Sequence, residues 1–134
     1  MWSVAGKEIA PDWLKFEPIE VLYDFDGPSI FTLADCHGDP YLAYLCDHED
    51  RVARFLVVKI GHSTAFSLKL GGFDVRSVLD CGTRWVFDVP ASGSIRCWEI
   101  NSAEVPDDIL PKRGVMLWPE LRSVIHRQTT RFSE

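Results

Sequence analysis

The sequence predicts an α+β fold: an antiparallel sheet of five or six strands, built as a meander plus a hairpin, with a short helical pair packed on one face. Apolar and polar residues alternate with the period of a strand in residues 19–26 and again in 84–89. Between them, residues 63–80 show the period of a helix. With 134 residues, 46% apolar and 25% charged, the chain has the composition of one globular domain.

The first strand has the clearest pattern. Apolar residues occupy every odd position from Ile19 to Phe25, which predicts that this face is buried, while Glu20, Asp24 and Asp26 face away. Turn sequences rich in Gly, Pro and Asp separate the strands that follow. Those strands are predicted at residues 29–35, 41–46 and 52–60. The last of them is apolar on both faces, which is typical of a central strand.

Two short helices and a hairpin complete the predicted fold. The first helix begins at Ser63 and is stopped by Gly71-Gly72, and the second follows an N-cap at Asp74. Alternating residues then predict strands at 84–89 and 95–100, joined by a Pro- and Gly-containing loop. Several prolines predict an extended segment over residues 101–119.

No repeat or Gly/Ser linker divides the chain, so residues 1–134 are expected to form a single domain with loose ends at 1–12 and 124–134. The N-terminal residues lack the features of a secretory signal, and no apolar run approaches the ~20 residues of a membrane span. We therefore expect a cytoplasmic protein that has no membrane association and whose four cysteines are free thiols.

Charge is segregated along the chain. The net charge of −6 has the wrong sign for a nucleic-acid binder. Residues 17–50 carry nine acidic residues and no Lys or Arg, whereas the chain from Arg51 onward has a net charge of +3. One interpretation is that the carboxylates keep the sheet soluble and are balanced by Arg51, Arg54 and Arg84. The other is that they form a docking surface for a basic partner.

Two short segments contain residue types that are found in enzyme or metal sites. The segment 21–28, with Asp24 and Asp26, resembles the opening signature of haloacid-dehalogenase-like phosphatases, but Pro28 replaces its Thr and no alternation of strands and helices follows. Cys36, His37, Cys46 and His48 include the residue types of a zinc site. The predicted pairing places Cys36 and Cys46 roughly 16 Å apart, too far to share one ion.

Several longer segments resemble a family of small bacterial proteins of about this length, a domain of unknown function. The matching residues are Glu17–Pro28, Tyr41–Tyr44, Arg54–Val58 and Val105–Pro111 with Gly114. This resemblance implies one compact domain and brings no established activity.

The sequence therefore favours a non-enzymatic interaction module that docks a basic protein, as the inhibitory or accessory member of a bacterial two-gene system. The expected contact residues are Asp24, Asp26, Asp47, Glu49 and Asp50, and no cofactor or metal is expected. A second hypothesis is a small cation-dependent hydrolase centred on Asp24 and Asp26, with Asp47 as a further ligand. A third is self-association as a homodimer, in which the acidic half of one chain meets arginines of another.

Overall fold

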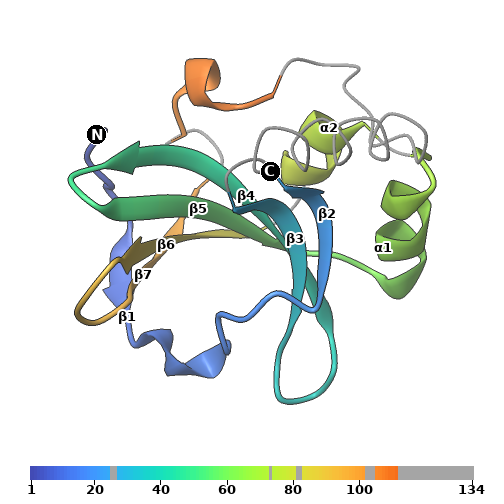
Figure 1. The fold of residues 1–134 in the computed structure, drawn as a ribbon, viewed down its shortest axis with the longest axis horizontal. Coiled ribbons are helices and arrows are strands. Elements are labelled where there is room, and N and C mark those ends of the chain that lie inside the picture. Colours follow the sequence, from blue (N-terminus) through green and yellow to red (C-terminus); the bar gives the residue numbers. More distant parts are fainter. Residues whose placement is uncertain (25–26, 73, 81–82, 102–104, 112–134) are drawn as a thin grey trace, which may run out of the picture.

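The computed structural model describes residues 1–24, 27–72, 74–80, 83–101 and 105–111, and its main feature is one antiparallel sheet (Figure 1). The sheet has seven strands in the spatial order β1-β7-β6-β5-β4-β3-β2. Two short α-helices accompany the sheet. The α+β expectation is confirmed, but the predicted number of five or six strands is too low.

Four consecutive strands form the predicted meander, each pairing with the next along the chain. Their bounds are β2 (Glu20–Asp24), β3 (Pro28–Ala34), β4 (Pro40–Glu49) and β5 (Val52–Lys59). β5 is the central strand, as its continuous apolar run predicted. Its residues 55–58 alternate between the two faces of the sheet, and all four are buried.

The two helices lie in the chain between β5 and β6, and their bounds are α1 (His62–Lys69) and α2 (Val75–Leu79). The predicted stop of α1 is confirmed: Gly71 has a φ of 77°, and the N–H of Gly72 returns to the carbonyl of Ser67. The predicted N-cap of α2 is confirmed as well, since the Asp74 carboxylate accepts a hydrogen bond from the Arg76 N–H at 2.9 Å. None of the described helices is long and apolar enough to cross a membrane.

The predicted hairpin of β6 and β7 is present, and an additional strand, β1, pairs with β7 on the side away from β6. The bounds are β6 (Arg84–Pro90), β7 (Arg96–Ile100) and β1 (Lys7–Ile9). β1 was not predicted, because three residues with one apolar side chain give no periodic signal. It falls within residues 1–12, which were expected to be a loose start. A Cβ atom at Gly6 would lie 2.1 Å from the carbonyl oxygen of Glu99, so only glycine lets the chain approach β7 this closely.

One face of the sheet is covered by the helices, as predicted. Leu68 of α1 and Val75, Val78 and Leu79 of α2 belong to a core with strand residues such as Leu42. A 3-10 helix, η3 (Asp107–Ile109), follows β7 on this side (Figure 1). It falls in the stretch predicted as extended, whose residues 102–104 and 112–119 lie outside the described part of the chain, as do 124–134.

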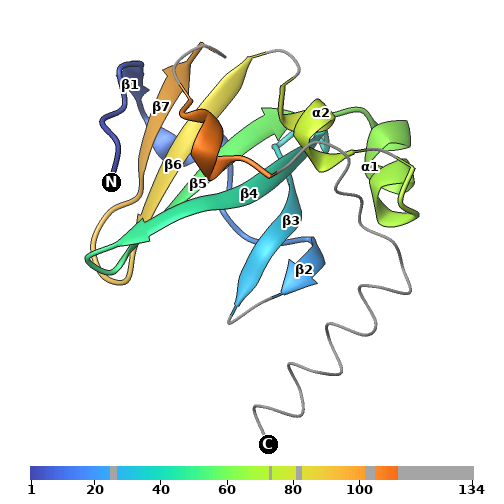
Figure 2. The ribbon, with the colours of Figure 1, turned by 90° about the horizontal axis from the view of Figure 1, so that it is seen from above.

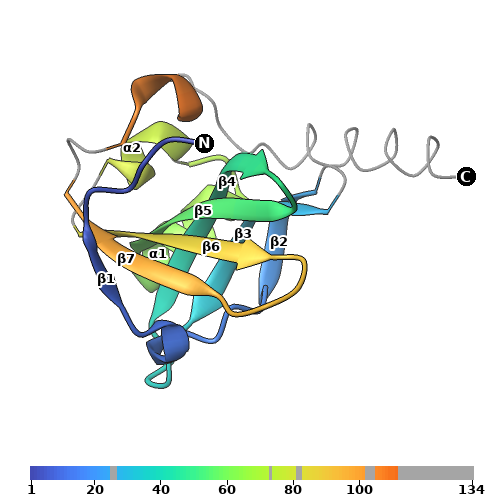
Figure 3. The ribbon, with the colours of Figure 1, turned by 90° about the vertical axis from the view of Figure 1, so that its left-hand side faces the viewer.

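The opposite face is covered by the connection between β1 and β2. Figure 3 shows β1 beside β7 at one edge of the sheet and β2 at the other. The connection crosses between them through a 3-10 helix, η1 (Pro11–Trp13), and buries Leu14. Trp13 lies 4.9 Å from Trp85 and Phe16 lies 5.0 Å from Phe55, measured between ring centroids. This aromatic layer completes a core on both faces.

The predicted orientation of the first strand is wrong. Leu22 is completely buried against the helix-covered core, whereas Ile19 is 67% exposed and Val21 is 38% exposed. Phe25 and Asp26 lie outside the described residues. At β2, which is an edge strand, residues 19–22 keep the predicted alternation but bury the opposite face, and the pairing with β3 becomes irregular only after Val21.

Candidate interaction surface

The five residues predicted to bind a partner belong to two different turns. Asp24 ends β2, at the turn that leads into β3, while Asp47, Glu49 and Asp50 lie at the turn from β4 to β5. Both turns lie at the same end of the meander, because its connections alternate between the two ends of the strands, and Figure 2 shows the tip of the β4–β5 hairpin set apart from β2 and β3. The structure thus places three of the five residues at one turn and Asp24 at the end of a neighbouring hairpin, and it does not describe Asp26.

The turn between β4 and β5 presents its acids at the surface. A register shift between Leu45 and Asp47 opens the ladder just before the turn. Asp50 and Arg51 then reverse the chain with φ values of 51° and 63°, and both side chains are exposed. We refer to Asp47, Glu49 and Asp50 as the β4–β5 turn acids.

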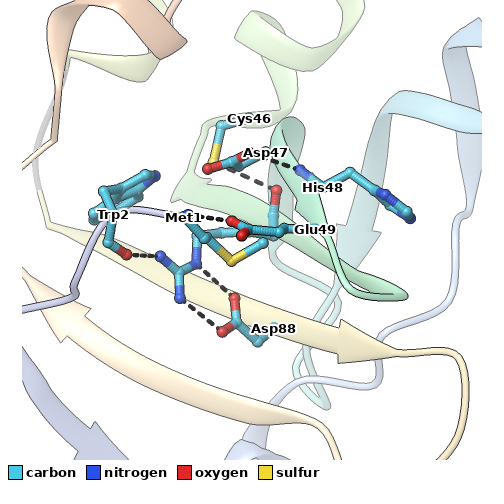
Figure 4. A network of polar contacts seen from close by, with 8 residues as sticks. Met1, Trp2, Cys46, Asp47, His48, Glu49 and Asp88 are labelled. Atoms are coloured by element: carbon cyan, nitrogen blue, oxygen red, sulfur yellow. Dashed lines mark hydrogen bonds and ion pairs between the residues drawn. The ribbon is translucent and has the colours of Figure 1, made fainter.

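Glu49 is already engaged within the molecule. Its carboxylate accepts a hydrogen bond from the ammonium group of Met1, and this contact lowers the pKa of Glu49 and raises the pKa of the Met1 ammonium (Figure 4). The Asp47 carboxylate accepts a hydrogen bond from the N–H of His48 at 2.9 Å. A partner could therefore use Asp47 and Asp50 without first displacing the N-terminus.

Asp24 has a structural role in its own turn. Its carboxylate accepts a hydrogen bond from the N–H of Gly27 at 3.1 Å, and Gly27 has a φ of 113°, which favours glycine. This hydrogen bond within the turn accounts for an aspartate at position 24 without a bound ligand.

Arg54 forms a buried charged network that the sequence analysis missed. The residue is 6% exposed, and its side chain makes two hydrogen bonds, of 2.7 and 2.8 Å, to the carboxylate of Asp88 on β6. It also donates to the carbonyl of Trp2, whose ring lies 4.8 Å from the guanidinium (Figure 4). The network therefore ties the N-terminal residues to the centre of the sheet. The sequence did hold a signal for this network, because Arg54 and Asp88 are opposite charges within otherwise apolar strand segments.

Two further buried arginines, Arg76 and Arg84, contact the helical region. Arg84 is 1% exposed, and burial lowers its pKa. It donates to the carbonyl of Leu79 at 2.9 Å and lies 3.6 Å from the carboxylate of Asp80. Arg76 lies 3.3 Å from Asp80 and also pairs with Asp107. These cations are neutralised within the second half of the chain.

The arginines expected to balance the acidic segment therefore mostly do not do so. Arg54 pairs with Asp88 and Arg84 with Asp80, both outside residues 17–50. Of the three arginines considered, Arg51 alone lies at an acidic turn.

Other acids of residues 17–50 have local partners. Glu17 pairs with Lys15, Glu20 with Lys69 and Asp39 with Lys59. The Asp35 carboxylate accepts hydrogen bonds from the N–H groups of His37 and Asp39 and from the hydroxyl of Tyr41. Burial raises its pKa, but these hydrogen bonds outweigh that effect and leave the pKa below its ordinary value.

A shallow groove of about 300 Å³ lies between α1 and β2, which we call the α1–β2 groove. The Lys69 ammonium and the Glu20 carboxylate, 2.8 Å apart, connect the two elements. Its lining is mostly apolar and small, and consists of Ile19, Glu20, Thr32, Leu33, Ala34, Gly38, Pro40, His62, Ala65, Phe66 and Lys69. Phe66 is 64% exposed, so this groove has an unusually apolar rim.

The residue types of a zinc site do not come together. Cys36 lies in the turn between β3 and β4, whereas Cys46 lies beyond the last β3–β4 pair, Ile30 with Tyr44, at the other end of the strands. In the described part of the chain, no group of three or more His, Cys, Asp and Glu side chains is placed to hold a metal ion. The three described cysteines, Cys36, Cys46 and Cys97, are free thiols.

Comparison of the chain with protein-family models, with curated proteins and with solved structures finds no match. The resemblance to a family of small bacterial proteins stays a prediction. The functional argument rests on the placement of charged and apolar side chains.

Proposed function

We propose that this protein is a non-enzymatic interaction module that binds a basic protein partner through a contact centred on the β4–β5 turn acids. The proposal places its action in the cytoplasm, which the free thiols of the described cysteines support.

The observation that carries this proposal is the internal use of the buried arginines. Arg54, Arg76 and Arg84 pair with carboxylates on β6, at the end of α2 and on η3, so they do not neutralise the nine acids of residues 17–50. A surface with charges of one sign accelerates the encounter with an oppositely charged partner and disfavours others. Asp50 is exposed at the tip of its turn, where a partner can reach it.

The test removes two charges from the turn without straining it. In the variant Asp47→Asn/Asp50→Asn, asparagine tolerates the positive φ of residue 50 and keeps the size of each side chain. The control Glu99→Gln/Asp108→Asn makes the same change in net charge at exposed positions on β7 and η3. Tagged proteins are used to capture partners from the native host at low salt, and association rates of the recovered protein are then measured.

We expect a basic protein to bind the unmodified chain and the control alike, and to associate several-fold more slowly with the turn variant. The difference should shrink as salt is raised, because surface charges are screened. Equal binding by both variants would show that the turn acids only solubilise the sheet.

If no basic protein is captured, the proposal fails, and the two alternative hypotheses, a hydrolase and a self-associating protein, are tested directly. A cation-dependent hydrolase centred on Asp24 and Asp26 should show a higher melting temperature in millimolar magnesium. A self-associating protein should show a larger mass in solution at low salt than at high salt.

A further inference from the structure

Exposed apolar side chains gather at the α1–β2 groove. Ile19 and Phe66 line the groove and are 67% and 64% exposed. Leu70, one helical turn beyond Phe66, and Val21, two residues beyond Ile19, are exposed as well. These are four of the five large hydrophobic side chains that are exposed in the described part of the chain. A gathering of this kind marks an interaction site.

The shape of the groove suits a protein surface better than a small molecule. Its volume of about 300 Å³ is at the lower limit of small-molecule sites, which enclose most of their ligand, and this groove is shallow. β2, which forms one side of it, is an edge strand, and within the described residues no strand pairs with its outer side. A shallow apolar face beside a sheet edge is a surface that another folded protein can cover.

The charges at the groove are already balanced. The Glu20 carboxylate and the Lys69 ammonium, both on the groove lining, lie 2.8 Å apart. Asp39 lies between two lining residues of the β3–β4 turn, and its carboxylate is 3.3 Å from the Lys59 ammonium. Because these two acids have lysine partners, the groove attracts a basic protein far less than the β4–β5 turn acids do.

The same charges fit a second copy of the groove. In a two-fold symmetric contact, any residue of one copy that meets a second residue of the other does so twice, with the roles exchanged. A two-fold axis through the groove can therefore place Glu20 of each copy against Lys69 of the other, and Phe66 against Ile19. The Glu20 and Lys69 side chains are each 42% exposed, so both can reach a second copy without leaving a buried site. The groove is thus complementary to itself in charge and in apolar character.

We propose that two copies of this chain form a symmetric dimer through the α1–β2 groove, in which each copy covers Ile19 and Phe66 of the other. This dimer does not depend on the proposed partner. β4 runs from Pro40, which lines the groove, to Glu49 at the β4–β5 turn, a length of about 30 Å. The turn acids of both copies therefore stay accessible, and either proposal can fail without the other.

Sedimentation equilibrium of the full chain at several concentrations tests the proposal. The unmodified chain should show a dimer whose fraction rises with concentration and persists at high salt, because the contact is mainly apolar. Covering one large apolar side chain is worth about tenfold in affinity or more, and each copy contributes two. The variant Ile19→Gln/Phe66→Gln should therefore dimerise at least about a hundredfold more weakly. Both side chains are exposed, so the fold should persist, and circular dichroism verifies this.

A charge exchange shows whether the two copies meet at this groove. Glu20→Lys leaves two cations at the ion pair and Lys69→Glu leaves two anions, so each variant alone should dimerise several-fold more weakly than the unmodified chain. An equal mixture of the two variants should recover the dimer, because one copy then supplies the cations and the other the anions. Ala91→Gln, in the exposed turn between β6 and β7, is the control and should dimerise normally.

Three results would overturn the proposal. The first is a monomer at every concentration of the unmodified chain. The second is a dimer that the groove variant leaves unchanged, or a mixture of the two charge variants that associates no better than each alone. The third is a dimer that dissociates at high salt, since the contact would then join acidic and basic surfaces and not the apolar groove.

Discussion

Substituting Asp88 with leucine removes the carboxylate that neutralises the buried guanidinium of Arg54. Arg54 would keep only the carbonyl of Trp2 and the two indole rings, of Trp2 and Trp98, that lie 4.8 and 5.9 Å from it. Breaking a buried pair from one side is costly because the other charge is left unpaired.

The size of the effect follows from the contacts that are lost. Two charged hydrogen bonds, of 2.7 and 2.8 Å, disappear, and each such bond contributes about 1.5–3 kcal/mol. The nearby rings compensate in part, so we expect Asp88→Leu to lower the free energy of unfolding by about 3 kcal/mol. With a urea dependence of about 1.5 kcal/mol per molar, the midpoint of unfolding should fall by about 2 M.

The double variant Arg54→Met/Asp88→Leu provides the control. It removes both charges and fills the space with apolar side chains, a replacement that is often neutral. We expect its free energy of unfolding, from urea denaturation followed by tryptophan fluorescence, to lie within about 1 kcal/mol of that of the unmodified protein. A double variant as unstable as Asp88→Leu would refute the reasoning, because the loss would then come from packing and not from an unpaired charge.

Three further outcomes are expected. Gly6→Ala should destabilise the protein by about 1–3 kcal/mol in urea unfolding, because its Cβ would collide with β7, whereas Gly61→Ala, at an open position, should cost much less. Burial of the ring, helped by a hydrogen bond to a carboxylate, raises the pKa of Tyr41 to about 12. The folded state thus holds the phenol proton more tightly than the unfolded state, so this contribution to stability is complete below pH 10 and is lost as pH rises toward 12, a loss that Tyr41→Phe should abolish in alkaline unfolding. Mass spectrometry of the native protein treated with iodoacetamide at pH 8 should show exposed Cys36 modified well before Cys46, whose pKa burial raises to about 12.

Contrary results would identify the error in each case. Equal effects of the two glycine substitutions would mean that β1 does not pair closely with β7. Alkaline unfolding that is unchanged in Tyr41→Phe would assign the transition to another group. Simultaneous modification of the two cysteines would mean that the β4 thiol is accessible to solvent.

Local signals in the sequence were sufficient for most elements. Alternation in residues 84–89 predicted β6, runs bounded by turn sequences predicted β3, β4, β5 and β7, the glycine pair predicted the end of α1, and Asp74 predicted the start of α2. These features depend on backbone conformation and on neighbours a few residues away, which a sequence records directly.

The sequence by itself also determined that acids concentrate in residues 17–50 and that the arginines follow later. Only the tertiary structure decided which of these charges meet. The pairing of Arg54 with Asp88 depends on the register of β5 against β6, which joins residues 34 positions apart.

The tertiary structure likewise decided the face of β2 and the place of β1. Leu22 is buried and Ile19 exposed because the packed core lies against the other face of this edge strand, and a three-residue strand forms only because β7 offers it a partner. Burial is a property of the assembled sheet, whereas periodicity is a property of the chain, and the two differ most at the edges, where pairing is least regular.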